Sequence, residues 1–472
     1  VINQLGGWDE ATDPVGWQPK PTVFERAAAA GVDLTLNGVD ATKVLGFKDK
    51  VIGRLYKGLQ GLVKARKIDY VEGFGKLTGP NTVTVETESG TRTLNGKNVI
   101  LASGSYSKTL PGIDLGGRFL DSETALQLPE LPKNPIILGG GVIGVEFASI
   151  WKSLGAESVT IVEGLPHLVA NEDEAISKAL ERAYKKRGIA YSLGVFTEKA
   201  EQDENGVKVT LADGKVFEAD VVLVAVGRAP RTEDMGYEDL GIPMDRGFVT
   251  PNERLHTGVG NIYAIGDIVP GVQLAHRGYQ QGRFVAEEIA GNKPMVVEDI
   301  NIPKVTFTEP EIMSVGYTQP KAEEKFGKEN IETFEYNLLG NGKSSILGTG
   351  GIIKLVREKD GPIVGFHAIG KRISEQIGEG QLIVNWEAYP EDVAQFIHAH
   401  PTQNEAIGEA AMALATPAED QARLLEDALA VVRQQTLLMR RCLETPGKLM
   451  DALKCRYALT FRNAAFLVRA RY

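Results

Sequence analysis

A glycine-rich turn between a short apolar strand and a helix most constrains the fold of this chain. Residues 135–138 read Pro-Ile-Ile-Leu and run directly into a Gly-Gly-Gly-Val-Ile-Gly string. Gly139, Gly141 and Gly144 fit the spacing G-x-G-x-x-G, in which glycines allow a tight turn, close approach of a diphosphate and packing of helix on strand. The pattern predicts a Rossmann βαβ unit over residues 135–163.

The second strand of this unit, residues 159–162, ends at Glu163. An acidic side chain at this point accepts hydrogen bonds from ribose hydroxyls and repels a 2′-phosphate. Residues 164–170 contain no Lys or Arg, so we predict binding of NAD rather than NADP. A glycine-rich turn beside an unrelated surface glutamate is the alternative, but strand, helix and acid together favour the nucleotide site.

Composition narrows the class of protein. A chain of 472 residues with 43% hydrophobic content is long enough for two to four domains. Its formal charge of −10 argues against nucleic acid as a partner. The two cysteines, Cys442 and Cys455, form no disulfide framework, which favours a reducing compartment. We expect no membrane-spanning segment and no metal site.

Coarse periodicity divides the chain. Residues 44–67 have helical spacing, and residues 69–71, 82–85 and 98–104 have strand character. Strands and helices alternate from 135 to 227, which predicts a parallel sheet. A strand at 262–265 and a helix at 278–290 follow, and then residues 302–415 place strands first (305–307, 352–355 and 363–369) and helices afterwards.

Several further motifs accompany the glycine turn. They are Ala102-Ser103-Gly104-Ser105, Val226-Gly227-Arg228, the string from Asn261 to Asp267, Leu274-Ala275-His276, residues 306–311, and the string from His398 to Glu405. With these motifs the chain, from about residue 42 to residue 415, resembles the dihydrolipoamide dehydrogenases among the flavoprotein disulfide reductases. The resemblance implies NAD and FAD as cofactors and the reaction of dihydrolipoamide with NAD⁺ to give lipoamide and NADH.

The resemblance also assigns cofactor-binding residues. Asp267 would bond the ribityl chain of the flavin, and the backbone of Ala275 and His276 would face its pyrimidine edge. The full expected set is Gly139, Gly141, Gly144, Glu146, Glu163, Gly227, Ser103, Gly104, Asp267, Ala275 and His276.

His400 and Glu405 are the expected catalytic pair. Oxidation of a dithiol needs a base near neutral pH, which an imidazole held by a carboxylate supplies. The resemblance implies that this pair reaches the partner subunit of a homodimer. It also implies a lipoylated acyltransferase of 2-oxoacid dehydrogenase complexes as partner, and a location in the bacterial cytoplasm or the mitochondrial matrix. Two histidines that only cap a turn are the alternative.

The expected fold class is α/β, with a doubly wound NAD-binding Rossmann domain, an incomplete FAD domain, an α+β dimerisation domain and a helical tail. The expected boundaries are 1–22 for an irregular segment, 23–128 for the incomplete FAD domain, 129–246 for the NAD domain, 247–302 for the rest of the FAD and central domain, 303–415 for the dimerisation domain and 416–472 for the tail.

The chain also departs from the family. No G-x-G-x-x-G precedes Gly139, and no C-x-x-x-x-C pair occurs. Glu146 would lack the lysine that its counterpart has, and a buried carboxylate without a partner tends to take up a proton. We therefore expect weak or absent FAD binding and impaired oxidation of dihydrolipoamide. A non-catalytic NAD-binding pseudoenzyme and a composite chain are the alternatives.

The tail is basic and helical in pattern, unlike the acidic remainder. Residues 419–454 resemble the N-terminal helices of the large retromer subunit, an α-solenoid scaffold. From Cys455 onward, arginines alternate with aromatic residues, a pattern that would contact anionic lipid but is more often a solvated helix.

Overall fold

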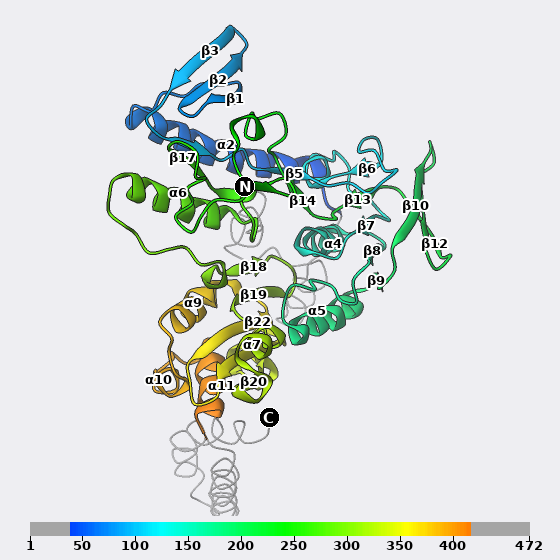
Figure 1. The fold of residues 1–472 in the computed structure, drawn as a ribbon. Coiled ribbons are helices and arrows are strands. Elements are labelled where there is room, and N and C mark those ends of the chain that lie inside the picture. The colour runs from blue at the N-terminus through cyan, green and yellow to red at the C-terminus, as the bar shows by residue number, and fades with distance from the viewer. Residues whose placement is uncertain (1–37, 417–472) are drawn as a thin grey trace, which may run out of the picture. The chain divides into compact units, whose positions relative to one another are not determined.

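The computed structural model describes residues 38–416, in which two compact units are present (Figure 1). Among the described residues, the first unit comprises 38–170 and 181–302, and the second comprises 171–180 and 303–416. Both units contain helices and strands, as the expected α/β class requires. The finer six-part division of the chain remains a prediction.

The main sheet of the first unit has five parallel strands. Across the sheet they are β6 (Phe119–Leu120), β13 (Val222–Val224), β7 (Ile136–Leu138), β8 (Val159–Glu163) and β9 (Ile189–Leu193). Helix α4 (Val142–Leu154) follows β7, and helix α5 (Glu174–Arg187), whose residues up to Leu180 belong to the second unit, follows β8. Gly155 ends α4 in the left-handed conformation, with φ 112°, as helix C-caps often do. The predicted βαβ unit is therefore present.

Smaller sheets complete the first unit. A second parallel pair joins β4 (Val99–Leu101) to β17 (Ile262–Ala264), and its core includes Leu101, Ile262 and Ala264. The remaining strands are β1 (Phe74–Gly79), β2 (Thr82–Thr87), β3 (Gly90–Asn95), β5 (Ser105–Ser107), β10 (Thr197–Gln202), β11 (Val207–Leu211), β12 (Val216–Ala219), β14 (Arg228–Pro230), β15 (Met244–Asp245) and β16 (Phe248–Val249). The helices beside these strands are α3 (Ser122–Ala125) and α6 (Ala275–Ile289).

The first described helix, α2 (Ala41–Ala65), covers most of the range predicted from helical spacing. Asp40 caps it, because its carboxylate accepts the backbone N–H of Lys43 at 3.2 Å. Lys48 is buried and donates to the carbonyl oxygen of Leu126 at 2.8 Å. Much of the apolar side of α2 is nevertheless exposed, with Leu59 at 58% and Leu62 at 60%.

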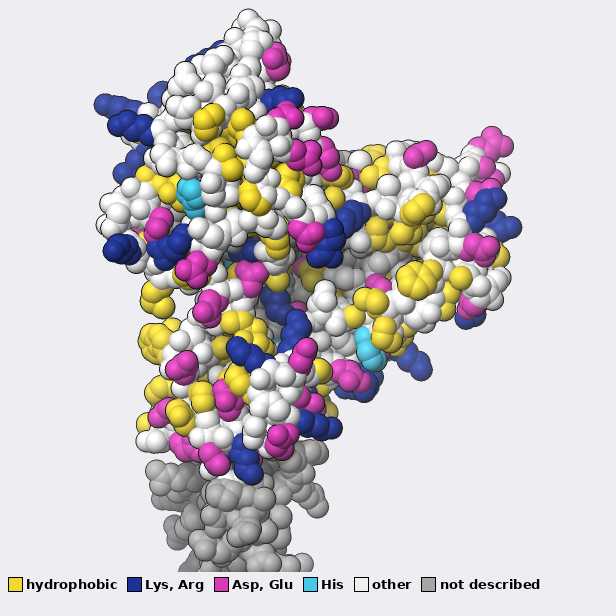
Figure 2. All heavy atoms as spheres, in the orientation of Figure 1, with side chains coloured by type: hydrophobic (Ala, Val, Ile, Leu, Met, Phe, Trp, Pro, Cys, Tyr) yellow, Lys and Arg dark blue, Asp and Glu magenta, His cyan; other side chains and the backbone are white. Residues whose placement is uncertain are grey.

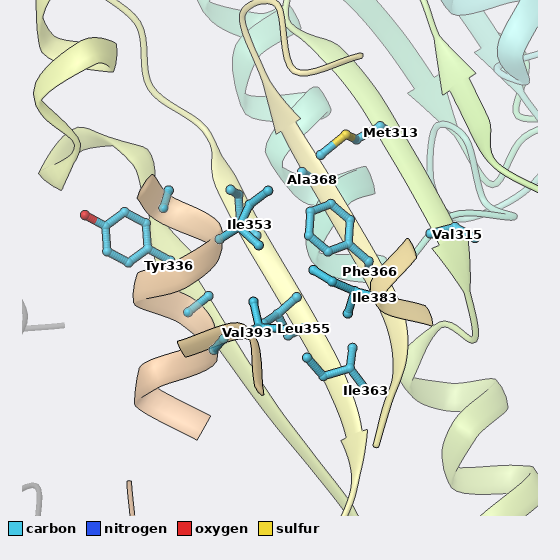
Figure 3. Packing of buried hydrophobic residues seen from close by; sticks show 14 of the residues in the cluster. Met313, Val315, Tyr336, Ile353, Leu355, Ile363, Phe366, Ala368, Ile383 and Val393 are labelled. Carbon is cyan, nitrogen blue, oxygen red and sulfur yellow. The ribbon is translucent and has the colours of Figure 1, made fainter. Parts of the chain in front are cut away.

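The second unit is built on an antiparallel five-stranded sheet. Its order is β18 (Lys304–Thr306), β19 (Glu311–Gly316), β22 (Ile363–Gly370), β21 (Ile352–Glu358) and β20 (Ile331–Asn337). Figure 3 shows one face of this sheet, where Ile353, Leu355 and Phe366 point toward helices. The helices of this unit include α7 (Gln319–Phe326), α8 (Gly342–Leu347), α9 (Ile377–Asn385), α10 (Pro390–Ala394) and α11 (Glu405–Ala415). The three predicted strands precede α9, α10 and α11 in the chain, as predicted.

Some local predictions were wrong. Residues 69–71 are not a strand, and the first described strand, β1, begins only at Phe74. Helix α6 begins at Ala275, before the predicted residue 278. The predicted irregular segment 1–22 and the retromer-like tail lie outside the described residues.

Two surface properties bear on possible partners. Within residues 38–416, no helix combines the length and apolarity that crossing a bilayer requires. On the face in Figure 2, Lys and Arg side chains are interspersed with Asp and Glu side chains. This face therefore has no continuous basic surface of the kind that binds nucleic acid.

Candidate functional site

The glycine turn after β7 has the backbone geometry that its sequence predicts. Gly139 has φ +108°, and a Cβ atom there would lie 2.4 Å from the carbonyl oxygen of Ala225. A Cβ atom at Gly144 would lie 1.9 Å from the carbonyl oxygen of Gly139. Gly141, the N-cap of α4, has open space and no side-chain cap. The N-terminus of α4 can therefore accept a diphosphate at its free N–H groups.

Glu163 lies beside this turn, at the end of β8. Its carboxylate accepts the backbone N–H of Gly140 at 2.5 Å and that of Leu165 at 2.8 Å. The predicted acid and the predicted glycines are thus brought together. Gly227, after β13, has φ +114° and open space where a Cβ atom would lie. These features fit a dinucleotide in which the ribose meets a carboxylate.

A second group of predicted residues lies at the carboxyl ends of β4 and β17. Because Leu101 pairs with Ala264, Ser103 and Gly104 emerge beside the loop that carries Asp267. Asp267 accepts a hydrogen bond from Ser105 Oγ at 2.5 Å. Loops at the carboxyl ends of parallel strands are where open α/β sheets bind ligands.

Several polar contacts hold these loops. Ser103 Oγ donates to the carbonyl oxygen of Arg231 at 2.5 Å and lies 3.1 Å from Tyr237 Oη. Burial raises the pKa of Tyr237, so its hydroxyl stays protonated at neutral pH. Arg228 Nε donates to Ser105 Oγ at 2.8 Å. The loop after β4 is thereby tied to chain segments far away in sequence.

Ala275 and His276 form the first turn of α6, and both are exposed. The buried Gln281, further along the same helix, accepts the backbone N–H of Gly266 at 2.7 Å. Gly266 has φ +72° and open space where a Cβ atom would lie. The start of α6 and the Asp267 loop are therefore connected, as a flavin site formed by both requires.

His400 and Glu405 are paired. His400 Nδ1 lies 2.8 Å from Glu405 Oε1, and Glu405 Oε2 accepts the backbone N–H of Thr402 at 2.8 Å. The His400 side chain is 56% exposed, whereas that of Glu405 is 25% exposed. A partly buried carboxylate thus orients an accessible imidazole, which is the arrangement of a general base.

The sequence did not reveal the support behind this pair. His398 Nε2 lies 2.7 Å from Glu379 Oε1, and Glu379 Oε2 accepts from Asn404 Nδ2 at 2.6 Å. Glu379 therefore fixes both sides of the segment that carries His400. The string His-Ala-His marks this segment, but nothing near it in sequence points to α9.

One expectation about Glu146 is wrong. The residue is buried on α4, as predicted. It is not without a partner, since it takes part in a polar or electrostatic interaction within the structure. Burial raises the pKa of Tyr184, and the charge of Glu146 raises it further. The Tyr184 hydroxyl donates to the carbonyl oxygen of Val145 at 2.6 Å.

Comparison with known families covers both units. The model of the pyridine nucleotide-disulphide oxidoreductases matches residues 5–282, and that of their dimerisation domain matches residues 302–411. A mitochondrial dihydrolipoyl dehydrogenase of Pisum sativum is 36% identical over 393 residues, which are 81% of this chain and 78% of the relative. A dihydrolipoyl dehydrogenase of Geobacillus stearothermophilus is 39% identical over 388 residues, covering 80% and 81%. The crystal structure of LpdA from Mycobacterium tuberculosis superposes with a TM-score of 0.77 at 24% identity, covering 83% of this chain and 86% of that one, which shows a shared fold.

Proposed function

Because the chain belongs to the pyridine nucleotide-disulphide oxidoreductase family and is of the dihydrolipoyl dehydrogenase type, we propose that it transfers electrons between FAD and NAD. The flavin, when bound, would supply the carrier between thiol and nicotinamide chemistry. The turn at Gly139, Gly141 and Gly144 with Glu163 would hold NAD. Ser103, Gly104, Asp267 and the start of α6 would hold FAD.

The single observation that carries the proposal is the glycine turn in which the Glu163 carboxylate accepts the backbone N–H of Gly140. Gly144 leaves no room for a Cβ atom, whereas Gly141 faces open space. This combination supports close approach of a diphosphate to the backbone, and the carboxylate at 2.5 Å from the Gly140 nitrogen supports NAD over NADP.

For His400 we propose the role of base toward a dithiol, with Glu405 as the residue that orients it. The dimerisation domain supports a homodimer. A lipoylated acyltransferase is the partner we propose, and the bacterial cytoplasm or the mitochondrial matrix the location.

We further propose that these 472 residues do not by themselves oxidise dihydrolipoamide. The reaction needs a cysteine pair to accept electrons from the dithiol, and the only cysteines are Cys442 and Cys455. Their spacing differs from C-x-x-x-x-C. Electron transfer from NADH to an artificial acceptor needs no thiol and would persist where flavin binds.

The test is a set of assays on the full chain incubated with FAD. We expect NAD binding by calorimetry and no NADH formation from dihydrolipoamide, and we expect reduction of a dye by NADH in the fraction of the protein that binds flavin. NADH formation from dihydrolipoamide would overturn the proposed impairment. In that event the double variant Cys442→Ser and Cys455→Ser, compared with the parent chain, would show whether these two thiols serve.

A second candidate function is NAD binding without catalysis. The exposure of α2 around Leu59 and Leu62 favours it, because an apolar helix face left open in the described residues weakens the flavin side of the first unit. NAD binding with no flavin absorbance after incubation with FAD would select this candidate. An intact-mass measurement, compared with the coding DNA, would address a composite chain.

A further inference from the structure

The sheet of the second unit has a polar row on the face opposite its apolar core. The row runs straight across the sheet, because its members are register partners: Lys304 with Ser314, Ser314 with His367, His367 with Lys354, and Lys354 with Glu335. Ser314 and His367 are fully buried, and Lys354 is 5% exposed. Side chains alternate between faces of a strand, so all five belong to one face.

A separate segment, Asn171–Leu180, brings two carboxylates to this row. Asp173 Oδ1 lies 2.9 Å from Lys354 Nζ, and Glu172 Oε1 lies 3.3 Å from Lys304 Nζ. The Asp173 side chain is 1% exposed and that of Glu172 is 6% exposed. The Lys354–Asp173 pair is buried on both sides, whereas in the second pair Lys304 is 26% exposed, and breaking a buried pair leaves a charge without compensation.

Asp173 joins three parts of the second unit. Its carboxylate accepts the backbone N–H of Ala175 at 3.1 Å, in the first turn of α5, and that of Gln319 at 2.9 Å, at the start of α7. Lys354 Nζ also donates to Gln319 Oε1 at 2.8 Å. Burial alone would raise the pKa of Asp173, but the charge of His367 when protonated, the Lys354 ammonium and the Gln319 amide together lower it.

His367 lies in the middle of the row. Its Nε2 lies 2.9 Å from the carbonyl oxygen of Tyr317, so this nitrogen carries the proton and donates. Burial lowers the pKa of His367, and Lys304 adds to that effect, while Asp173, the Tyr317 carbonyl and Glu172 oppose it. With His367 neutral, the charges of Lys304 and Lys354 balance those of Glu172 and Asp173. Glu335, 48% exposed, contacts Lys354 from the rim.

We propose that this row is an acid-operated latch, in which protonation of His367 releases the segment Asn171–Leu180 from the sheet of the second unit. A proton on His367 adds a third positive charge to the buried part of the row, where Lys304 and Lys354 already match Glu172 and Asp173, while Glu335 lies at the rim and is 48% exposed. Release lets water solvate that charge, which a closed, buried row does not allow.

The sign of the pH dependence follows from the direction of the shift. The pKa of His367 in the closed latch lies below its ordinary value of 6.5. The closed form therefore binds fewer protons than the open form, so its stability is full above that value and is lost as the pH falls below it. Acidification from about pH 7.5 to about pH 5.5 should favour opening about tenfold, the limit for one proton.

Histidine NMR on the full chain provides the first test. The chain has six histidines, so their ring C–H signals can be resolved and assigned by single substitutions. We expect the signal that disappears in His367→Gln to titrate below the ordinary value. In Glu172→Gln it should titrate lower still, because one opposing charge is removed. Titration of His367 at or above 6.5 would overturn the latch.

Hydrogen exchange measured by mass spectrometry provides the second test. Protection factors of peptides from residues 171–180, corrected for intrinsic rates, should fall about tenfold between these two pH values in the parent chain. The fall should be absent in His367→Gln, which keeps an N–H donor for Tyr317 but takes up no proton. His256→Gln, in the first unit, is the matched control and should respond like the parent.

A pH-independent protection factor in the parent chain would contradict the proposal, as would an unchanged response in His367→Gln. If His367→Gln does not fold, Glu172→Gln decides, because loss of the Glu172–Lys304 ion pair should lower protection at every pH, and the pH-dependent fall should extend to lower pH than in the parent. These measurements involve neither NAD nor FAD, so their failure and the failure of the proposed function are distinguishable.

Discussion

The first unit contains two parallel sheets whose loops carry predicted cofactor contacts, and the two differ in the support behind those loops. The sheet with β7 at its centre has five strands, and β7 is buried along its whole length. The pair of β4 and β17 has two strands, and Ile100 of β4 is 42% exposed. Parallel strands are normally covered on both faces.

This difference shows what fixes each loop. The glycine turn after β7 is fixed by backbone packing, since Gly144 meets Gly139 with no space for a Cβ atom. The loops after β4 and β17 depend on side-chain hydrogen bonds among Ser105, Asp267 and Arg228. The NAD end should therefore tolerate changes of polar residues better than the flavin end.

The largest expected effect on the free energy of unfolding comes from truncating the side chain of the last residue of β7 and, for comparison, of β4. Leu138→Ala, in β7, should lower the free energy of unfolding by about 4 kcal/mol, and Leu101→Ala, in β4, by about 2 kcal/mol. The second site has fewer neighbouring strands and so collapses more easily around the cavity. Urea unfolding followed by fluorescence, with the buried Trp151 as a probe, measures both losses. Equal losses would erase the contrast between the sheets.

Gly144→Ala should cost about 3 kcal/mol, because its methyl group would meet the carbonyl oxygen of Gly139. Thermal unfolding and NAD titration should both show the change. Gly141→Ala is the matched control, since its methyl group enters open space and should weaken NAD binding without a comparable loss of stability. Similar melting temperatures for the two variants would contradict a turn fixed by packing.

Asp267→Ala should cost about 1–2 kcal/mol, the usual effect of leaving a hydrogen-bond donor such as Ser105 without its acceptor. Hydrogen exchange in peptides from β4 and β17 should accelerate, while peptides from β7 should not change. Asp245→Ala, on an exposed pair with Arg246, is the control and should leave both regions unaltered. Faster exchange in β7 would mean that the two sheets are not independently supported.

The smallest effect concerns cofactor choice. Glu163→Gln should weaken NAD binding about tenfold, because a neutral amide accepts less strongly from Gly140 and from a ribose hydroxyl. Binding of NADP should weaken less, since a negative charge is removed. Calorimetric titration with both nucleotides checks this, with the exposed Glu157→Gln as control. An unchanged ratio between NAD and NADP would remove Glu163 from the specificity site.

The βαβ unit was predictable because its determinants are local. Glycine spacing, the strand before it and the acid after it all lie within residues 135–163, and the pairing of Glu163 with Gly140 stays within that unit. The pair of His400 and Glu405 is local as well, because the two residues are five positions apart in the sequence. Short sequence separation leaves few alternative geometries.

Contacts that depend on register were not predictable. The row from Lys304 to Glu335 exists because five strands align at one level, and single-strand patterns do not specify that alignment. Asp173 and Glu379 likewise act on residues of other elements. The early start of α6 was missed because its N-cap is Leu274, which makes no side-chain hydrogen bond. The sequence therefore has no capping residue to mark this start.

The position of Asp173 also has a consequence for the order in which the protein is assembled. A ribosome synthesises the chain from its N-terminus. Asp173 precedes Lys354 by 181 residues. The segment Asn171–Leu180 is therefore synthesised long before Lys354, and Asp173 has no ion pair with that lysine while residues 181–353 are translated. The second unit acquires its final form only late in translation. Any factor that protects nascent chains would meet this segment before Asp173 has paired with Lys354.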